Sequence, residues 1–295
     1  MNHKISSEKV LFCDLCRSPN KKIIDEEGAV VQCINCGLKY LKLRSSQKDI
    51  AVSYDYNYAN YWRDFAPEAE LMYERRCNFM QRFVRQGRVL DVGSGRGEFL
   101  GEVKKRGSWQ CFGTETSSYA LEFAKKKLDI ELSLGQLEEL NYPDRFFDAI
   151  SFWHVLEHLP YPSRALKEAR RILRDKGFLF IAVPNDSWLG RKHFFKNAFK
   201  KAINRLPLKN KLKLKKMYPQ INEEGNKHLF YFTPRTLREL LKRCGFRIKA
   251  QAIDYDYEER TAHIERKYRI DSLICRLTGI NFSNAILLAA EKKES

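Results

Sequence analysis

The chain has 295 residues, with 54 Lys and Arg against 37 Asp and Glu, which gives a formal net charge of +17. This length exceeds one average domain and leaves room for a full core. No apolar run approaches the roughly 18 residues of a membrane span, and the polar start lacks the apolar core of a signal peptide. We therefore expect a cytoplasmic protein rather than a membrane-spanning one, and the charge favours an anionic partner.

Four of the eight cysteines form two pairs near the start of the chain, Cys13-x2-Cys16 and Cys33-x2-Cys36. Two such pairs supply four thiolates for tetrahedral Zn2+, and Gly37 suits the tight turn after the last ligand. The spacing predicts a zinc ribbon over residues 1–44, with residues 38–43 as its last strand. The alternative is four reduced cysteines in a disordered arm. An aromatic linker is expected at residues 45–66.

Strand and helix patterns alternate from residue 67 to residue 295, which predicts an α/β domain with helices on both faces of a mainly parallel sheet. Strands are expected at residues 88–92, 109–114, 131–134, 147–152, 178–183, 246–255 and 284–291. Helices are expected at residues 68–83, 98–106, 117–127, 163–173, 233–244 and within 258–279. Thr233 is the expected N-cap of its helix, and Gly245 follows its end.

The segment VLDVGSGRGEF, residues 89–99, places a glycine-rich turn between the first strand of this domain and its helix. Glycine lets backbone N–H groups approach a ligand closely. The G-x-G-x-G spacing departs from the G-x-G-x-x-G of dinucleotide-binding folds, which disfavours NAD. Glu115 ends the next strand, where such folds place a carboxylate on a ribose. The sequence predicts a nucleoside site that contains Asp91, Gly93, Ser94, Gly95, Gly97 and Glu115.

The strand at residues 147–152 runs into the segment HVLEHL, residues 154–159. Ligands of open parallel sheets lie beyond the carboxyl ends of the strands, so this segment is expected beside the nucleoside. A single helical turn would bring His154, Glu157 and His158 to one face. Alternatively, Glu157 and His158 bond only to backbone and hold the turn.

The glycine turn, Glu115 and the block FDAISFWHVLEHLPYPSRALKEARRILRDKGFLFIAVPN resemble class I S-adenosylmethionine-dependent methyltransferases. The resemblance covers residues 68–292 and is closest to the ubiquinone-biosynthesis O-methyltransferases and to zinc-ribbon-bearing relatives in sugar and glycan modification. It implies a Rossmann-like seven-stranded sheet. It also implies that Asp91 and the glycines hold the amino-acid end of the cofactor, that Glu115 takes the ribose, and that Gln136 and Leu137 reach the adenine. Gln136 stands where many members carry Asp.

The resemblance also bears on catalysis. Some relatives bind a divalent metal through Glu-x-x-Glu-His, but this chain has His154 in place of the first Glu, which leaves a second metal site open. Methyl transfer to a hydroxyl needs in-line placement and a group that takes the proton. His154 is the first candidate for this base and His228 the second, although His228 could also be a surface residue.

Residues 191–216, within an expected insert at 188–225, carry eleven Lys and Arg and no acid. Phe194, Phe195 and Phe199 would give a helix there an apolar side, which favours peripheral contact with an anionic membrane over a solvated lid.

The predicted function is methyl transfer from S-adenosylmethionine to an oxygen of a small-molecule or lipid-linked anionic acceptor. A sugar or glycan is the leading candidate for this acceptor. An RNA-modifying methyltransferase is one alternative, since a zinc ribbon and a basic arm also grip nucleic acid. A non-catalytic cofactor-binding or interaction module is the other.

Overall fold

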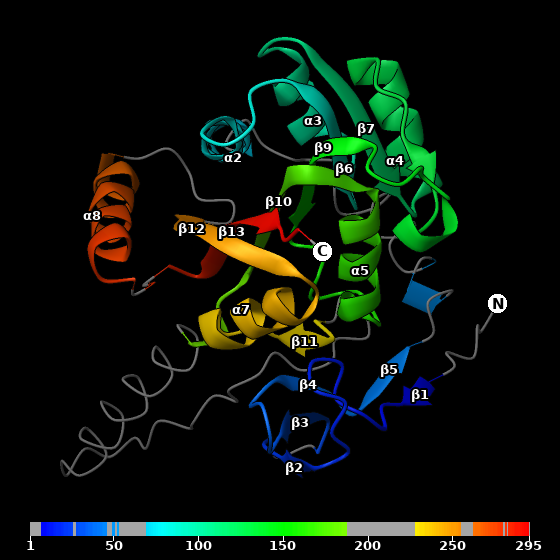
Figure 1. Ribbon diagram of the computed structural model, residues 1–295, viewed down its shortest axis with the longest axis vertical. Coiled ribbons are helices and arrows are strands. Elements are labelled where there is room, and N and C mark those ends of the chain that lie inside the picture. The colour runs from blue at the N-terminus through cyan, green and yellow to red at the C-terminus, as the bar shows by residue number, and fades with distance from the viewer. Residues whose placement is uncertain are drawn as a thin grey trace, which may run out of the picture.

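The computed structural model describes residues 7–25, 28–45, 49–50, 52, 69–187, 228–254, 262–279, 281 and 283–294. They form an α/β domain with a small β-ribbon packed against it (Figure 1). The basic insert expected at 188–225 lies outside the described residues, as does most of the linker expected at 45–66. Within the described part of the chain, no helix is long and apolar enough to cross a membrane.

The α/β domain is built on one sheet of seven strands in the order β12-β13-β10-β9-β6-β7-β8. All neighbours pair in parallel except β13, which runs antiparallel to both β10 and β12. The strands are β6 (Gly87–Val92), β7 (Trp109–Glu115), β8 (Ser133–Leu134), β9 (Phe147–Trp153), β10 (Leu173–Pro184), β12 (Phe246–Asp254) and β13 (Ala285–Lys292). The expected seven-stranded, Rossmann-like α/β sheet is confirmed.

The helices follow the expected order with small changes at their ends. They are α2 (Ala69–Gln81), α3 (Glu98–Lys104), α4 (Ser118–Phe123), α5 (Pro162–Ile172), α7 (Pro234–Arg243) and α8 (Ala262–Thr278). The helix expected at 117–127 is α4, capped by the Ser117 side chain and continued by a π-helical turn, η2 (Ala124–Leu128). A short 3-10 helix, η3 (Leu137–Glu139), follows β8.

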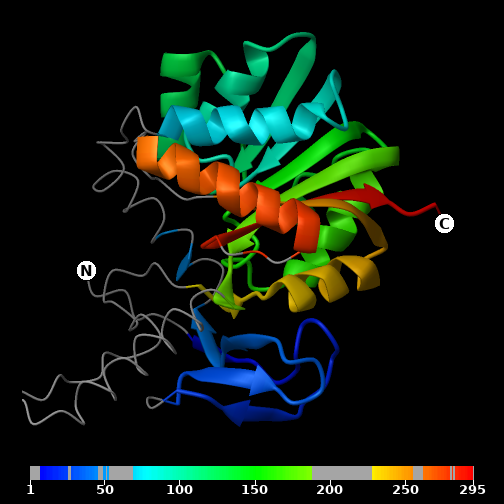
Figure 2. The same cartoon turned by 90° about the vertical axis from the view of Figure 1, so that its left-hand side faces the viewer.

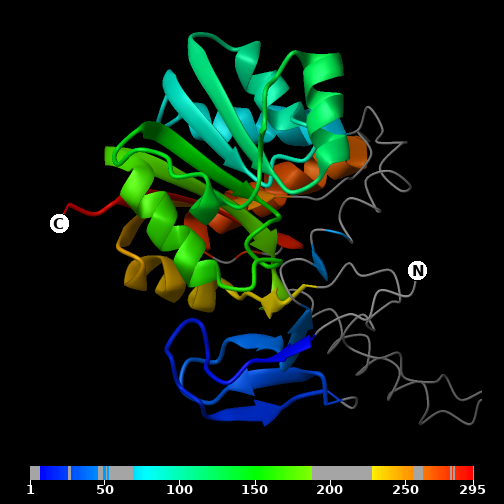
Figure 3. The ribbon, with the colours of Figure 1, turned by 90° about the vertical axis from the view of Figure 1, so that its right-hand side faces the viewer.

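The helices cover both faces of the sheet. Helices α2 and α8 run over one face (Figure 2), and α5 and α7 cover the opposite one (Figure 3). On the first face, Cys77 and Met80 of α2 pack with Phe99 and Leu100 of α3 in one apolar cluster. Apolar burial on both faces explains why the central strands read as nearly continuous hydrophobic runs.

The ribbon consists of β1 (Ser7–Lys9), β2 (Lys21–Ile23), β3 (Val30–Cys33), β4 (Lys39–Leu41) and β5 (Leu43–Ser45). The strand expected at 38–43 is thus divided between β4 and β5. Strand β4 pairs with β11 (Phe230–Tyr231), which lies just before α7, so the ribbon sheet has the order β11-β4-β3-β2. A strand from the larger domain therefore completes the ribbon (Figure 1).

Candidate active site

The candidate site lies where the chain leaves β6, which is flanked by β7 on one side and by β9 on the other. This is the point where the strand order reverses, and ligands of open α/β sheets bind in the crevice beyond it. A cavity of about 320 Å³ opens there, a size in the range of small-molecule sites. Its walls include Asp91, Gly93, Ser94, Gly95, Glu115, Gln136, Leu137, His154, Glu157, His158 and His228.

The glycine turn is held in a backbone conformation that side chains rarely adopt. Gly93, Gly95 and Gly97 have φ angles of +65°, +56° and +80°. A Cβ on Gly93 would lie 2.6 Å from Cγ2 of Val155, so the turn packs directly against the segment after β9. Gly97 is not at the cavity wall and instead occupies the N-cap of α3. The glycines therefore serve both the turn and its close contact with the histidine segment.

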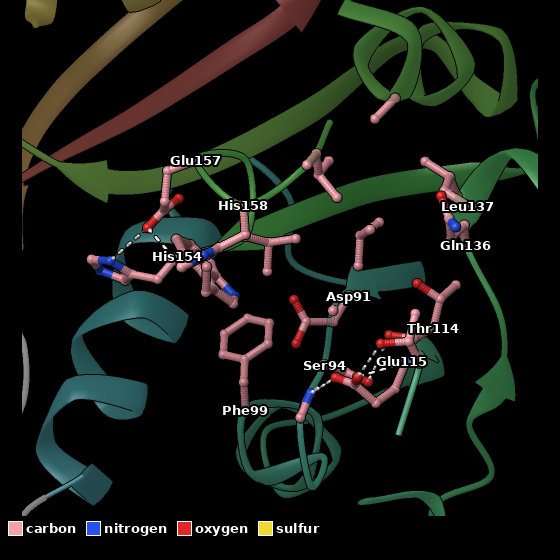
Figure 4. A pocket seen from close by; sticks show the side chains of 18 of the residues that line it. Asp91, Ser94, Phe99, Thr114, Glu115, Gln136, Leu137, His154, Glu157 and His158 are labelled. Atoms are coloured by element: carbon pink, nitrogen blue, oxygen red, sulfur yellow. Dashed lines mark hydrogen bonds and ion pairs between the residues drawn. The ribbon is translucent and has the colours of Figure 1, made fainter. Parts of the chain in front are cut away.

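Glu115 fixes the glycine turn from the end of β7. Its Oε2 accepts the Gly95 N–H at 2.9 Å, and its Oε1 accepts the Thr116 N–H at 2.6 Å and the Ser117 N–H at 3.2 Å. Burial raises the pKa of Glu115 and outweighs these bonds, which act in the opposite direction. Figure 4 shows the carboxylate beside the cavity near Ser94 and Thr114.

Asp91 is 2% exposed and points into the same cavity (Figure 4). It is the register partner of Ser151 in β9, whose Oγ donates to Asp91 Oδ1 at 2.6 Å. Burial raises the pKa of Asp91 to about 7, although the Ser151 hydroxyl and the Arg76 charge oppose the shift. Near neutral pH this carboxyl is therefore poised between its two protonation states.

The histidine segment closes the opposite side of the cavity. Strand β9 ends at Trp153, and His154 takes a left-handed φ of +56°, which turns the chain sharply. The His158 N–H then donates to the Val155 carbonyl at 2.9 Å, which closes one turn rather than a helix. This turn brings His154 Nδ1 to 3.5 Å and His158 Nε2 to 3.9 Å from Glu157 Oε1.

Glu157 lies at the centre of this group and is 1% exposed. Neither of its carboxylate oxygens has a hydrogen-bond partner among the described residues. Burial opposes its ionisation, but the imidazoles of His154, His158 and His228 outweigh burial and lower the pKa of Glu157. Glu157 is therefore a buried carboxylate with open lone pairs.

His228, which enters just before β11, completes the group. Its ring centroid lies 4.8 Å from that of His158, and ligating atoms of Glu157, His158 and His228 lie within 4.8 Å of one another. Two imidazoles and a carboxylate suit a divalent transition metal. The set differs from the His154, Glu157 and His158 suggested by the sequence, because His228 comes from a distant segment.

Arg76 at the cavity wall and its ion-pair partner Asp254, which is not part of the wall, are not apparent from sequence motifs. Arg76 of α2 lines the cavity and donates through Nε and Nη2 to Asp254 Oδ2 at 3.0 and 2.8 Å. His154 Nε2 lies 3.8 Å from the same oxygen. Burial opposes ionisation of Asp254, but Arg76 and His154 outweigh it and lower its pKa. Asp254 ends β12, so the convergence of strand ends could have found it, whereas Arg76 lies within a helix without such a signal.

The four ribbon cysteines form a second cluster, away from the cavity. Cys13 Sγ lies 3.5 Å from Cys36 Sγ, Cys16 Sγ lies 3.5 Å from Cys33 Sγ, and all four sulfurs lie within 4.8 Å of one another. Zn–S bonds of about 2.3 Å in a tetrahedron place sulfurs about 3.8 Å apart, so the cluster fits Zn2+.

We expect about one tightly bound zinc per chain, because four converging thiolates form a closed structural site. The double variant Cys33→Ser, Cys36→Ser should lose this zinc, whereas Cys77→Ser, which alters a buried cysteine of α2, should retain it. Elemental analysis of the purified proteins measures the metal. Equal zinc content in the double variant and the native chain would refute the assignment.

Comparisons with known proteins identify the family. Residues 61–251 match a family model described as a methyltransferase domain. The mitochondrial ubiquinone biosynthesis O-methyltransferase of Candida albicans is 36% identical over 107 residues, 33% of this chain and 32% of that enzyme. An uncharacterised protein of Methanocaldococcus jannaschii is 24% identical over 212 residues, 71% of this chain and 89% of that protein.

A solved S-adenosylmethionine-dependent methyltransferase of Thermotoga maritima, titled a possible histamine N-methyltransferase, shares the fold. It has a TM-score of 0.52 and 19% identity, with 82% of this chain and 99% of that chain covered. The chain thus belongs to the methyltransferase-domain family. Its fold is that of S-adenosylmethionine-dependent methyltransferases, and a four-cysteine ribbon lies N-terminal to that fold. The chain spans about a third of the length of the Candida enzyme, so its acceptor does not follow from that similarity.

Proposed function

We propose that this enzyme transfers the methyl group of S-adenosylmethionine to a hydroxyl oxygen of a small-molecule acceptor, with a sugar, glycan or lipid-linked intermediate as the leading class. The observation that carries the proposal is a single cavity with two chemically different ends. One end offers the glycine turn and Glu115, and the other offers His154, His158 and His228 around Glu157.

At the first end, each residue has a distinct task toward the cofactor. The glycine turn lies along the amino-acid end, and Glu115 accepts hydroxyls of the ribose. Gln136 and Leu137 form the adenine side, where Gln136 N–H donates to Glu139 Oε2 at 3.2 Å and so fixes the start of η3. Asp91 lies between the two ends and faces the positive charge of the cofactor.

At the second end, an acceptor hydroxyl would meet imidazoles. Methyl transfer requires the hydroxyl oxygen in line with the bond from the methyl carbon to sulfur, and enclosure in one cavity supplies much of that alignment. The hydroxyl proton passes to a base, for which His154 is the first candidate and His228 the second. Glu157 Oε1 lies 3.5 Å from His154 Nδ1, and Asp254 Oδ2 lies 3.8 Å from His154 Nε2. This end explains why an oxygen acceptor is favoured.

The residues at this end also fit a divalent ion, because Glu157 is buried without a hydrogen-bond partner among the described residues and two imidazoles adjoin it. Glu157, His158 and His228 would hold it. Bound there, a divalent ion would polarise the acceptor oxygen.

The acceptor class is tested by incubating the enzyme with methyl-labelled S-adenosylmethionine and matched panels of nucleotide sugars, polyprenyl-linked glycans, phenolic quinone precursors and tRNA. We expect transfer to a hydroxyl of one of the first two panels. Transfer to tRNA alone would establish the RNA-modifying alternative, and transfer to none, with cofactor bound, would favour a non-catalytic module. The assay is repeated with and without added divalent metal.

Asp91→Asn is expected to stabilise the apoprotein while weakening cofactor binding. The folded pKa of about 7 exceeds the ordinary value of 3.8, so the folded protein holds a proton that the unfolded chain releases. Stability linked to Asp91 is therefore present at acid pH and is lost as pH rises from about 4 to above 7. Its full size is at most about 4 kcal/mol. The amide cannot ionise, but it also cannot pair with the cationic cofactor.

Denaturant unfolding at pH 5 and pH 8, with calorimetric titration of S-adenosylmethionine, measures both effects. We expect the free energy of unfolding of Asp91→Asn to exceed that of the native chain by about 2 kcal/mol at pH 8. Asp148→Asn is the control and should lower the free energy of unfolding, because Asp148 accepts the Arg88 N–H at 2.7 Å and pairs with Arg174. A destabilised Asp91→Asn with native affinity would contradict the assigned role.

A further inference from the structure

The ribbon is tied to the histidine end of the cavity by main-chain hydrogen bonds. In the pairing of β4 with β11, Phe230 lies opposite Tyr40 and Tyr231 lies opposite Lys39. The Leu41 N–H also donates to the Leu229 carbonyl at 2.9 Å. Since His228 is the next residue toward the N-terminus, its position depends on this strand pairing.

The same short strand also holds the turn that carries Glu157. The Glu157 carbonyl accepts the Leu229 N–H at 2.8 Å and the Phe230 N–H at 3.1 Å. Strand β11 therefore pairs with the ribbon, while the N–H groups of Leu229 and Phe230 bond to the turn that carries Glu157. This arrangement sets the 4.8 Å separation of the His158 and His228 rings.

A third connection comes from within the first cysteine pair. Asp14, between Cys13 and Cys16, is 8% exposed and accepts the Ser163 N–H and the Ser163 hydroxyl, both at 2.8 Å. Ser163 lies in the first turn of α5, just after the histidine turn. Asp14 thus connects a metal-binding loop to the chain that follows His158.

Arg44 at the other end of the ribbon adds a fourth connection. It donates to the Pro160 carbonyl, and its guanidinium lies 4.1 Å from the ring centroid of Tyr161. Residues 157–163 are therefore held by the ribbon at Asp14 and Arg44 and, through β11, by β4.

The cofactor end is held by different elements. The Ser94 N–H donates to the Thr114 carbonyl at 2.9 Å, and Gly95 bonds to Glu115, so β7 supports the glycine turn. Helix α3 begins directly after that turn. Apart from the contact of Gly93 with Val155, the two ends of the cavity thus have separate supports.

We propose that the zinc-loaded ribbon positions the histidine end of the cavity. By folding onto β11 and residues 157–163, the ribbon places Glu157, His158 and His228 where they meet the acceptor. The cofactor end forms without the ribbon. Asp14 and Arg44 are positioning residues in this scheme. The inference rests on the proposed function, which identifies the histidine end of the cavity as the end that binds the acceptor.

The test is amide hydrogen exchange of the full chain, in which the native protein is compared with the zinc-free variant Cys33→Ser, Cys36→Ser in the same buffer, with calorimetric titration of S-adenosylhomocysteine. The variant replaces chelation, because a chelator would also remove a divalent ion from Glu157, His158 and His228. In the zinc-free variant, we expect exchange of residues 157–163 and 228–231 to rise at least about tenfold. Exchange of β6 and β7, and the affinity for S-adenosylhomocysteine, should stay within about twofold of the native values.

Asp14→Ala separates positioning from loss of the ribbon, because the cysteines remain. It should keep its zinc and its cofactor affinity, yet exchange faster at residues 157–163. Asp25→Ala is the matched control, because Asp25 accepts the Ala29 and Val30 N–H groups, at 3.3 and 2.9 Å, within the ribbon hairpin. We expect native exchange there in Asp25→Ala.

Unchanged exchange at residues 157–163 and 228–231 in the zinc-free variant, or in Asp14→Ala, would overturn the inference. Equal loss of order at β6 and β7, or loss of cofactor affinity, would also overturn it, because the ribbon would then support the whole fold. None of these readouts uses methyl transfer. Failure to methylate every acceptor panel, with the expected exchange pattern, would refute the proposed function alone.

Discussion

Gly93→Ala is expected to weaken S-adenosylmethionine binding at least about 30-fold, which corresponds to about 2 kcal/mol. The new Cβ would lie 2.6 Å from Val155 Cγ2, closer than side chains pack, so the glycine turn or Val155 would have to shift. The left-handed φ of +65° adds strain of about 1 kcal/mol. Calorimetric titration of the cofactor measures the loss.

Two further variants isolate the cause of that loss. Gly28→Ala has nearly the same φ, +69°, but nothing lies within 4 Å of its Cβ, so it carries the backbone strain without the clash. It should bind cofactor normally. Val155→Ala removes the two methyl groups nearest the new Cβ and should restore much of the affinity when combined with Gly93→Ala. Native affinity in Gly93→Ala alone would show that the turn is not part of the cofactor site.

His154→Asn is expected to lower turnover by a factor of about 100 to 10,000, the usual contribution of a positioned base. Asparagine is chosen because it tolerates the left-handed φ of +56° better than alanine does, so the turn is preserved. Cofactor affinity should stay within about twofold, because Glu115 and the glycine turn are untouched. Steady-state kinetics with the first acceptor found in the panels, together with calorimetry, gives both numbers.

His228→Gln provides the comparison. Full turnover in His154→Asn with a large loss in His228→Gln would move the base to His228. Full turnover in both variants would leave the reaction to proximity alone. A loss of cofactor affinity in His154→Asn that matches the loss of turnover would contradict the separation of the two ends of the cavity.

The local patterns of the sequence predicted which residues gather at the end of β6, because these residues are adjacent in the chain or end neighbouring strands. Asp91 lies near the end of β6, Gly93 and Gly95 follow that strand directly, and Glu115 ends its parallel neighbour β7, so the pairing of the two strands brings them together. The histidine turn was predicted for the same reason. In each case, a few residues at the carboxyl end of a parallel strand determine the geometry.

Contacts between distant segments could not be read in this way. Arg76 and Asp254 are 178 residues apart, and no motif links them. The pairing of β11 with β4 joins strands of only two and three residues, too short for a periodic pattern. His228 joins Glu157 and His158 through that pairing, which explains why the sequence suggested His154 as the third member instead.

The most direct measurement of the whole account is a crystal structure of the zinc-loaded protein with S-adenosylhomocysteine. We predict the ribose hydroxyls within hydrogen-bonding distance of Glu115 and the homocysteine end along the glycine turn. We also predict the sulfur directed toward the side of the cavity formed by His154 and Glu157. A nucleoside bound among the histidines, or bound outside this cavity, would contradict the account.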